Sequence, residues 1–252
     1  MEVDLTNKVV LVTGGSGGIG AAISESLARA NATVALHFNS NGDYAGELVK
    51  RLGNNSKCFQ ADLSQPQNAK ILFSNIVNTY GNIDVLVNNA GVFMKSPIGS
   101  NVEKCINDWD VTLAINLISA GILCHIAINH FKERSGGRII NIASRAAFRG
   151  ETEDYLAYAA SKGGLVSLSR SIARSFGRYN IKSFTIAPGF VRTKMTEEFL
   201  ARNEKNIIEN ELSLKEMTKT SDIAPVVTFI ASGLMDHATG CTIDINAGSY
   251  MR

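Results

Sequence analysis

Short hydrophobic runs alternate along the chain with longer segments in which apolar residues recur every three or four positions. The short runs are rich in valine and isoleucine and predict β-strands, whereas the longer period predicts amphipathic helices. Helical patterns of this kind span 19–30, 71–80 and 165–176. The predicted strands are Val9–Val12, Thr33–Phe38, Lys57–Gln60, Val85–Val87, Arg138–Ala143, Ile181–Ala187 and Thr242–Ile245.

The strict alternation of strand and helix predicts the fold class. Consecutive parallel strands need crossovers, and right-handed crossovers place helices on both faces of the sheet. We therefore expect a single α/β domain, residues 1–252, that is doubly wound and Rossmann-type with a seven-stranded parallel sheet. Such sheets bind ligands beyond the carboxyl ends of their strands. The segment 193–220 is longer than an ordinary connection and highly charged, so we expect a lid on the substrate side or a dimer arm.

Composition and charge narrow the classes of function. The 252 residues contain 25 Lys+Arg and 23 Asp+Glu, so the chain has no global field of the kind that attracts nucleic acid or an anionic membrane. An acidic start and short apolar runs indicate neither a signal peptide nor a transmembrane helix. We expect a cytoplasmic protein with reduced thiols and no metal site, because the four cysteines, Cys58, Cys105, Cys124 and Cys241, lie far apart.

A glycine-rich turn follows the first predicted strand. The segment Thr13–Gly20 reads TGGSGGIG and leads directly into an amphipathic helix. Its glycines allow a tight turn, the close approach of a pyrophosphate and anion binding by the N–H groups at the start of the helix. A tight turn without a ligand gives a similar pattern, so the glycines alone are weak evidence.

From this turn onward the chain resembles the short-chain dehydrogenase/reductase family. The further motifs are Asp62-Leu63 after the third strand, Asn88-Asn89-Ala90-Gly91 after the fourth, Asn116 in a central helix, Ser144 after the fifth strand, Tyr158-x-x-x-Lys162, and Pro188-Gly189 after the sixth. The resemblance covers nearly the whole chain. It implies an enzyme that transfers a hydride to or from a nicotinamide cofactor.

The resemblance also implies where that cofactor is held. The expected contacts lie after successive strands, and Asp62 is equally compatible with a turn or helix cap. The residues are Gly14, Ser16, Gly18, Ile19, Gly20, Asn39, Ser40, Asp62, Leu63, Asn89, Ala90, Gly91, Tyr158, Lys162, Pro188, Gly189, Val191 and Thr193.

The end of the second strand predicts which cofactor is preferred. Phe38 stands where related NAD enzymes carry an aspartate, whose carboxylate binds the ribose and repels a 2′-phosphate. Asn39 and Ser40 can donate hydrogen bonds to that phosphate, although both also suit an ordinary polar turn. The arginine that NADP enzymes often carry is missing, since Gly17 stands at one of its usual places. We expect NADP(H) rather than NAD(H).

Tyr158 and Lys162 are four residues apart in a predicted helix, so their side chains share one face. A free phenol has a pKa near 10, and an ammonium about 4 to 5 Å away favours the phenolate by roughly 4 kcal/mol at an effective dielectric constant of 20. We therefore expect Lys162 to lower the pKa of Tyr158 toward neutrality, with the oxidised nicotinamide adding positive charge.

The resemblance assigns a role to each of four catalytic residues. Tyr158 donates a proton to the substrate oxygen, and Ser144 holds that oxygen by a hydrogen bond. Lys162 also binds the nicotinamide ribose. Asn116 holds a water that relays protons to this lysine, although a buried asparagine that bends a helix would look the same in the sequence.

The segments 188–196 and 231–251 look most like the 3-oxoacyl-[acyl-carrier-protein] reductases, which reduce β-keto thioesters with NADPH. The chain departs from that pattern at Ser183, at Ala247 and in the Ser144-to-Tyr158 spacing, which is one residue longer than the commonest one. A dehydrogenase of a sugar, polyol or other secondary alcohol is the alternative. A non-catalytic, cofactor-sensing regulatory protein is the alternative from another class.

Two kinds of partner are expected. An acyl carrier protein needs a basic surface near the pocket, for which the sequence offers Lys132, Arg134, Arg138, Arg174 and Arg178, although such residues also occur as solvated helix ends. The family usually forms tetramers or dimers through the helices that hold Asn116 and Tyr158. The apolar residues available for this homo-oligomer, or for packing on the sheet, are Leu117, Ile118, Ile122, Leu165, Leu168 and Ile172.

Overall fold

Seven parallel strands form one sheet with the order β3-β2-β1-β4-β5-β6-β7 in the computed structural model, which describes residues 3–193, 196–197 and 211–252. The predicted fold class is confirmed, and each predicted strand end lies within one residue of the observed one. The strands are β1 (Val9–Val12), β2 (Thr33–Phe38), β3 (Lys57–Gln60), β4 (Val85–Asn88), β5 (Gly137–Ile142), β6 (Ile181–Pro188) and β7 (Thr242–Ile245).

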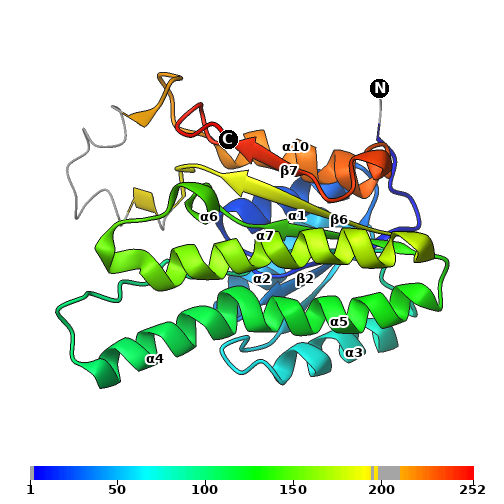
Figure 1. Ribbon diagram of the computed structural model, residues 1–252. Coiled ribbons are helices and arrows are strands. Elements are labelled where there is room, and N and C mark those ends of the chain that lie inside the picture. Colours follow the sequence, from blue (N-terminus) through cyan, green and yellow to red (C-terminus); the bar gives the residue numbers. More distant parts are fainter. Residues whose placement is uncertain (1–2, 194–195, 198–210) are drawn as a thin grey trace.

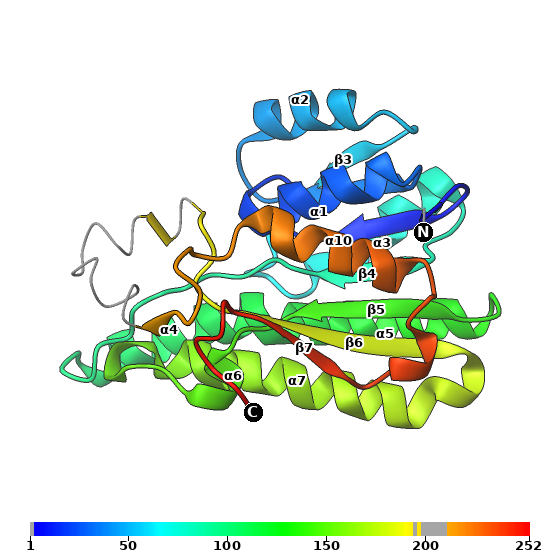
Figure 2. The same ribbon diagram turned by 90° about the horizontal axis from the view of Figure 1, so that it is seen from above.

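Helices cover both faces of this sheet (Figures 1 and 2). The helices α1, α2 and α10 bury their apolar side chains on one face, and α3, α5 and α7 bury theirs on the other. The longer described helices are α1 (Gly18–Arg29), α2 (Gly42–Leu52), α3 (Asn68–Tyr80), α4 (Val102–Leu113), α5 (Ser119–Lys132), α7 (Leu156–Phe176) and α10 (Thr220–Ala231). The four-residue helix α6 (Ala146–Arg149) follows β5.

The strand order reverses direction at β1, because the chain runs from β1 to β2 and β3 on one side and returns to β4 on the other. Ligands of doubly wound sheets bind at such a switch point, beyond the carboxyl ends of the strands. The register aligns these ends, since Asn88 of β4 lies opposite Asn141 of β5. Residues that directly follow β1, β4, β5 and β6 therefore meet at one edge of the sheet.

The helical stretch 102–132 is interrupted by one π-helical turn at Ala114–Ile118. It is 31 residues long with a hydropathy of 2.1 in its most apolar window, so length and composition alone would let it cross a membrane. Our expectation that no apolar run is long enough was wrong in this respect. Leu123, Ala127 and Phe131 of α5 are buried against the sheet, which accounts for the composition as that of a core helix.

The basic residues proposed for carrier-protein docking do not lie beside the carboxyl ends of the strands. Lys132 ends α5, before β5 begins, and its ammonium lies 4.7 Å from the centre of the Tyr179 ring. Arg138 near the start of β5 forms an ion pair with Asp236 at 2.7 Å. These residues occupy the amino ends of the strands, so the expected landing surface near the pocket was wrong in its location.

The apolar residues expected at an oligomer interface divide into two groups. Leu165 and Ile172 are buried within the domain, and Ile172 packs in the core cluster against the sheet, as the alternative of packing within the domain expects. Ile118 is exposed, as are Val102 and Ile106 of α4. Assembly into a dimer or tetramer stays a prediction that these exposed side chains support.

The expected lid at 193–220 lies mostly outside the described residues. Its described ends return to the domain, since Val191 forms an isolated bridge with Thr218. The N–H groups of Ser213 and Leu214 donate to the carbonyl oxygen of Ala247 at 3.0 and 3.1 Å. Closure of the segment over substrate stays a prediction.

Gly20 provides a test of how α1 packs on the turn that precedes it. A Cβ atom at this position would overlap with the carbonyl oxygen of Gly14 and lie 2.5 Å from the Nδ2 atom of Asn89. We expect Gly20→Ala to lower the free energy of unfolding by about 1–3 kcal/mol, because backbone must shift to make room. Thermal unfolding measures this, with a loss in melting temperature of about 2–4 °C for each kcal/mol.

Gly17→Ala is the matched control, because nothing lies within 4 Å of a Cβ atom at residue 17. Its melting temperature should stay close to that of the wild type. Equal melting temperatures for Gly20→Ala and the wild type would show that α1 does not press on the turn as described.

Candidate active site

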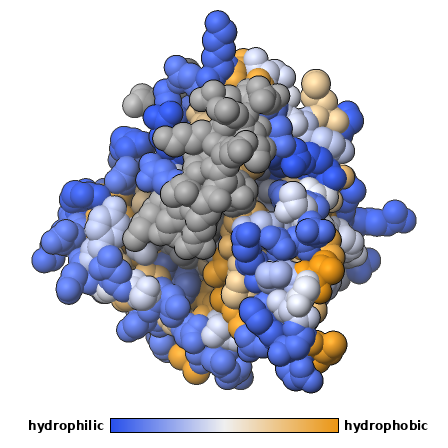
Figure 3. Space-filling model, turned by 90° about the vertical axis from the view of Figure 1, so that its left-hand side faces the viewer, coloured by the Kyte–Doolittle hydropathy of each residue, from blue (hydrophilic) through white to orange (hydrophobic). Residues whose placement is uncertain are grey.

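A groove runs along the carboxyl ends of the strands, at the end of the molecule that Figure 3 faces. Hydrophobic patches interrupt the mostly hydrophilic surface of this face (Figure 3). The groove brings together the β1–α1 turn, the segment after β4 and the start of α7. Its lining residues are Gly14, Ser16, Gly17, Gly18, Ile19, Asn89, Ala90, Gly91, Val92, Ile142, Ala143, Tyr158, Lys162 and Thr193.

Hydrogen bonds fix the glycine turn to β4. The Thr13 hydroxyl oxygen accepts from the backbone N–H groups of Asn89 and Ala90 at 2.9 and 3.0 Å. The Asn89 amide in turn donates to the carbonyl oxygens of Thr13 and Gly14 at 2.9 and 3.1 Å. Asn89, expected as a cofactor contact, therefore also holds the turn in place.

The residues of the groove fit a dinucleotide. Helix α1 begins after Gly17 with neither a side-chain cap nor an acidic residue in its first turn, so its first N–H groups are suited to a pyrophosphate. At Gly91 a Cβ atom would lie 3.3 Å from both Asn116 Oδ1 and Lys162 Nζ. Glycine therefore stands at Gly14, Gly18 and Gly91, where a larger side chain would narrow the groove.

Eight residues expected at the cofactor do not line this groove: Pro188, Gly189 and Val191 line an adjoining pocket instead, and five lie outside both. Asn39 and Ser40 are exposed after β2, and Phe38 turns its ring into the core. Asp62 accepts the Ser64 N–H group at 2.9 Å, the geometry of a turn. The other two are Leu63, which is buried in the core, and Gly20, which packs α1 on the turn.

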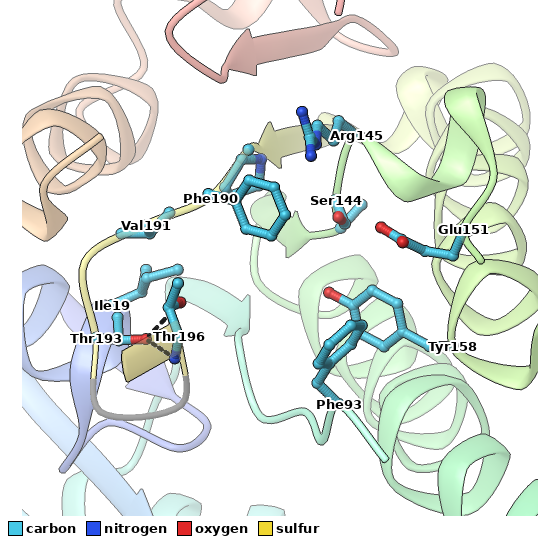
Figure 4. A pocket seen from close by; sticks show the side chains of 13 residues that line it. Ile19, Phe93, Ser144, Arg145, Glu151, Tyr158, Phe190, Val191, Thr193 and Thr196 are labelled. Atoms are coloured by element: carbon cyan, nitrogen blue, oxygen red, sulfur yellow. Dashed lines mark hydrogen bonds between the residues drawn. The ribbon is translucent and has the colours of Figure 1, made fainter. Parts of the chain in front are cut away.

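A second pocket adjoins the groove and shares Tyr158 with it (Figure 4). Figure 4 shows the hydroxyl groups of Ser144 and Tyr158 directed toward the same space. The ring of Phe93 meets Tyr158 edge-on at 4.7 Å between centres and stacks on Tyr155 at 3.9 Å, which limits the movement of the phenol. The lining residues are Ile19, Phe93, Ala143, Ser144, Arg145, Glu151, Tyr158, Pro188, Gly189, Phe190, Val191, Thr193 and Thr196.

Lys162 lies close to the phenol ring of Tyr158 and is only 5% exposed. Its ammonium donates to the carbonyl oxygen of Ile142 at 2.9 Å and lies 5.7 Å from the centre of the Tyr158 ring. Burial lowers the pKa of Lys162 to about 8, since removal from water disfavours the charged form. The lysine therefore loses its charge more readily than an exposed one.

Burial also dominates the ionisation of Tyr158 and raises its pKa to about 12. A hydrogen bond with Ser144 lowers the pKa in part, and the negative charge of Glu151 raises it. The expectation that Lys162 brings this pKa toward neutrality was wrong for the protein groups by themselves. Removal of the phenolate from water outweighs the attraction of an ammonium that is itself buried. At neutral pH the phenol keeps its proton and can donate it.

Asn116 lies in the π-helical turn, a form of backbone that is common at functional sites. Its Oδ1 atom accepts from the Val92 N–H group at 2.8 Å, and its Nδ2 atom donates to the Val92 carbonyl and the Ser161 hydroxyl at 3.0 and 3.1 Å. The residue therefore joins the central helix to the segment after β4. Its role in holding a water stays a prediction.

Six residues that line the pocket were not predicted as site residues: Phe93, Ala143, Arg145, Glu151, Phe190 and Thr196. Arg145 directly follows Ser144, is 2% exposed and forms an ion pair with Glu211 at 2.6 Å. Glu151 lies in the loop that is one residue longer than the family pattern, so that departure was the available signal. Its carboxyl points toward Ser144 and Tyr158 (Figure 4), and burial raises its pKa.

Known proteins resemble this chain along most of its sequence. A family model described as short chain dehydrogenase matches residues 8–204. The chain is 34% identical to nodulation protein G of Rhizobium sp. (strain N33), with 98% of this chain and 99% of that protein covered. It is 30% identical to 3-oxoacyl-[acyl-carrier-protein] reductase FabG of Aquifex aeolicus, with 99% and 100% covered.

A solved structure extends the likeness to three dimensions. A putative NAD(P)-dependent gluconate 5-dehydrogenase from Beutenbergia cavernae with bound NADP superimposes with a TM-score of 0.90 at 28% identity, covering 99% of both chains. The family match, the full-length relatives and the pocket that joins Ser144, Tyr158 and Lys162 agree. This chain belongs to the short-chain dehydrogenase family and is an NAD(P)-dependent oxidoreductase.

Proposed function

We propose that the protein is an NADPH-dependent carbonyl reductase that converts 3-oxoacyl thioesters into 3-hydroxyacyl thioesters. The observation that carries the proposal is the meeting of the Ser144 and Tyr158 hydroxyls in one pocket, beside a groove that fits a dinucleotide. Bound NADPH supplies the hydride. The likeness to 3-oxoacyl-[acyl-carrier-protein] reductases supports the choice of substrate.

The protein side of the reaction is a proton transfer to the carbonyl oxygen. Ser144 donates a hydrogen bond that holds this oxygen and stabilises the negative charge that develops on it. Tyr158 gives its proton to the same oxygen, which is consistent with the high pKa of the phenol. The ammonium of Lys162 lies near enough to stabilise the resulting phenolate.

An acyl carrier protein or coenzyme A would carry such a substrate. Since the basic residues at the amino ends of the strands lie away from the pocket, an acidic carrier would have to meet cations near its mouth. Among the described residues, Arg149 of α6 and Arg192 after β6 lie close in sequence to pocket residues, although Arg149 forms an ion pair with Glu211. This partner and a cytoplasmic location remain proposals.

Glu151 favours a second candidate, a dehydrogenase of a sugar, polyol or other hydroxylated ketone. Within the described part of the chain no cation lies at ion-pair distance from its carboxyl, although Arg145 and Arg149 are near enough to influence its pKa. This half-buried carboxyl accepts a hydrogen bond from the Thr152 backbone and can accept a further one. A hydroxyl group next to the reacting carbon would supply one, and the gluconate 5-dehydrogenase likeness agrees with such a substrate.

The role of Tyr158 is tested by Tyr158→Phe. We expect NADPH-dependent reduction of acetoacetyl thioester to fall at least about 100-fold, because the phenyl ring has no proton to donate. NADPH binding, measured by the fluorescence of the dihydronicotinamide, should persist. Retained turnover would overturn the assignment of the acid, and a wild type that binds NADPH without turnover would point to a cofactor-sensing protein.

Cofactor preference is tested by titrating the wild type with NADPH and with NADH. Since Phe38 offers no carboxylate to repel a 2′-phosphate, we expect NADPH to bind at least about tenfold more tightly, the effect of one hydrogen bond to a charged group. A lower dissociation constant for NADH would contradict the proposed preference.

Substrate class is tested by Glu151→Gln, with Glu153→Gln as the control from the same loop outside the pocket. If Glu151 binds a substrate hydroxyl, kcat/KM for a hydroxy ketone should fall about 10- to 100-fold, and that for acetoacetyl thioester should not. Loss of activity on neither substrate would remove the support for the second candidate.

A further inference from the structure

His37 lies at the end of β2, outside the catalytic pocket, and is 2% exposed. Its Nδ1 atom accepts a hydrogen bond from the N–H group of Gly14 at 3.0 Å. Its Nε2 atom contacts the carbonyl oxygen of Ala61 at 3.0 Å. One imidazole therefore joins the glycine turn after β1 to the residue that follows β3.

These two contacts define the form of the ring. The Gly14 N–H group donates to Nδ1, so this nitrogen carries no proton, and Nε2 must carry one to donate to Ala61. The ring is the neutral Nε2–H tautomer, and burial lowers the pKa of His37, which favours that neutral form. A charged ring would have no acceptor for the Gly14 N–H group.

The glycine turn is held from two sides by different residues. On the β4 side, Thr13 and Asn89 exchange the hydrogen bonds already described. On the β2 side, residue 37 holds two successive N–H groups, because its ring accepts from Gly14 and its backbone carbonyl accepts from Gly15 at 2.8 Å. The His37 side chain is thus the part of the β2 support that a substitution can remove.

Gly14 lines the groove that fits the dinucleotide, and its φ of +60° is one that other residues rarely adopt. Its carbonyl oxygen also lies so close to Gly20 of α1 that a Cβ atom at that position would overlap with it. Rotation of the Gly14 peptide would therefore alter the groove and the start of the helix together. Affinity for a phosphate group depends on the direction of the N–H groups in the glycine turn and at the start of α1.

We propose that His37 is a positioning residue that sets the affinity for the nicotinamide dinucleotide by fixing the peptide of Gly14. This inference rests on the proposed function only in that the groove must bind a dinucleotide. It predicts a defect in cofactor affinity with little effect on the chemical step, because His37 does not line the pocket that holds Ser144 and Tyr158.

His130 is the matched control. Unlike His37 it is half-buried, and its Nε2 atom accepts the Ile83 N–H group at 3.2 Å and lies 3.0 Å from the Oδ1 atom of Asn82. Ile83 precedes β4, at the edge of the sheet opposite the groove. Removing either ring takes an acceptor from a backbone N–H group, so loss of stability alone cannot separate the two variants.

The experiment compares the wild type with His37→Leu, His37→Gln, His37→Asn and His130→Leu. An asparagine Oδ1 atom stands near the place of Nδ1 and can accept from Gly14, whereas glutamine reaches toward the place of Nε2. We expect the dissociation constant and KM for NADPH to rise about tenfold in His37→Leu and His37→Gln, with kcat at saturating NADPH within about twofold of the wild type. His37→Asn should restore most of the affinity, and His130→Leu should not change it.

Three results would overturn the inference: unchanged NADPH affinity in His37→Leu or, if that variant does not fold, in His37→Gln; an equal loss in His130→Leu; or no recovery in His37→Asn. Wild-type protein that binds neither NADPH nor NADH would instead overturn the proposed function. The two failures are therefore distinguishable from the same set of titrations.

Discussion

The burial of an ammonium and a phenol side by side, at the edge of the sheet where the strands end, is the interaction on which the proposed chemistry depends. Lys162 contributes its charge where water is largely excluded, and its ammonium donates a hydrogen bond to the main-chain carbonyl of Ile142. Exclusion of water strengthens the attraction between the Lys162 ammonium and a negative charge that develops nearby. It also disfavours the phenolate, so Tyr158 stays protonated when no additional positive charge is present. The fold supports this arrangement by joining β5 and α7 at the same edge.

Most of the fold could be predicted from the sequence because the signals are local. Strands that are buried on both faces are continuous apolar runs, so their ends are marked by the first glycine, asparagine or charge. The Tyr158–Lys162 pair is visible because a spacing of four residues places both on one helical face. The groove around Gly14 is visible because several motifs follow successive strands.

The remaining features depend on distances through space. Whether Lys162 or burial controls the pKa of Tyr158 is decided by the surroundings of both groups, which no spacing reveals. The basic residues Lys132 and Arg138 precede β5, and strand direction carries them away from the pocket. Glu151 lies in the loop between Ser144 and Tyr158. The extra residue of this loop is visible in the sequence, but the position of Glu151 in the pocket is not. His37 acts across two strand ends that are far apart in sequence.

The state of Tyr158 also bears on the direction of the reaction. Reduction of a carbonyl begins with a protonated acid, and a pKa of about 12 keeps the phenol in that form throughout the physiological range. Oxidation of an alcohol must begin with the phenolate, which burial and the negative charge of Glu151 both disfavour. The phenol alone is thus in the form that reduction requires, whereas oxidation would require a positive charge such as that of an oxidised nicotinamide to lower this pKa, and loss of the Glu151 charge would act in the same direction.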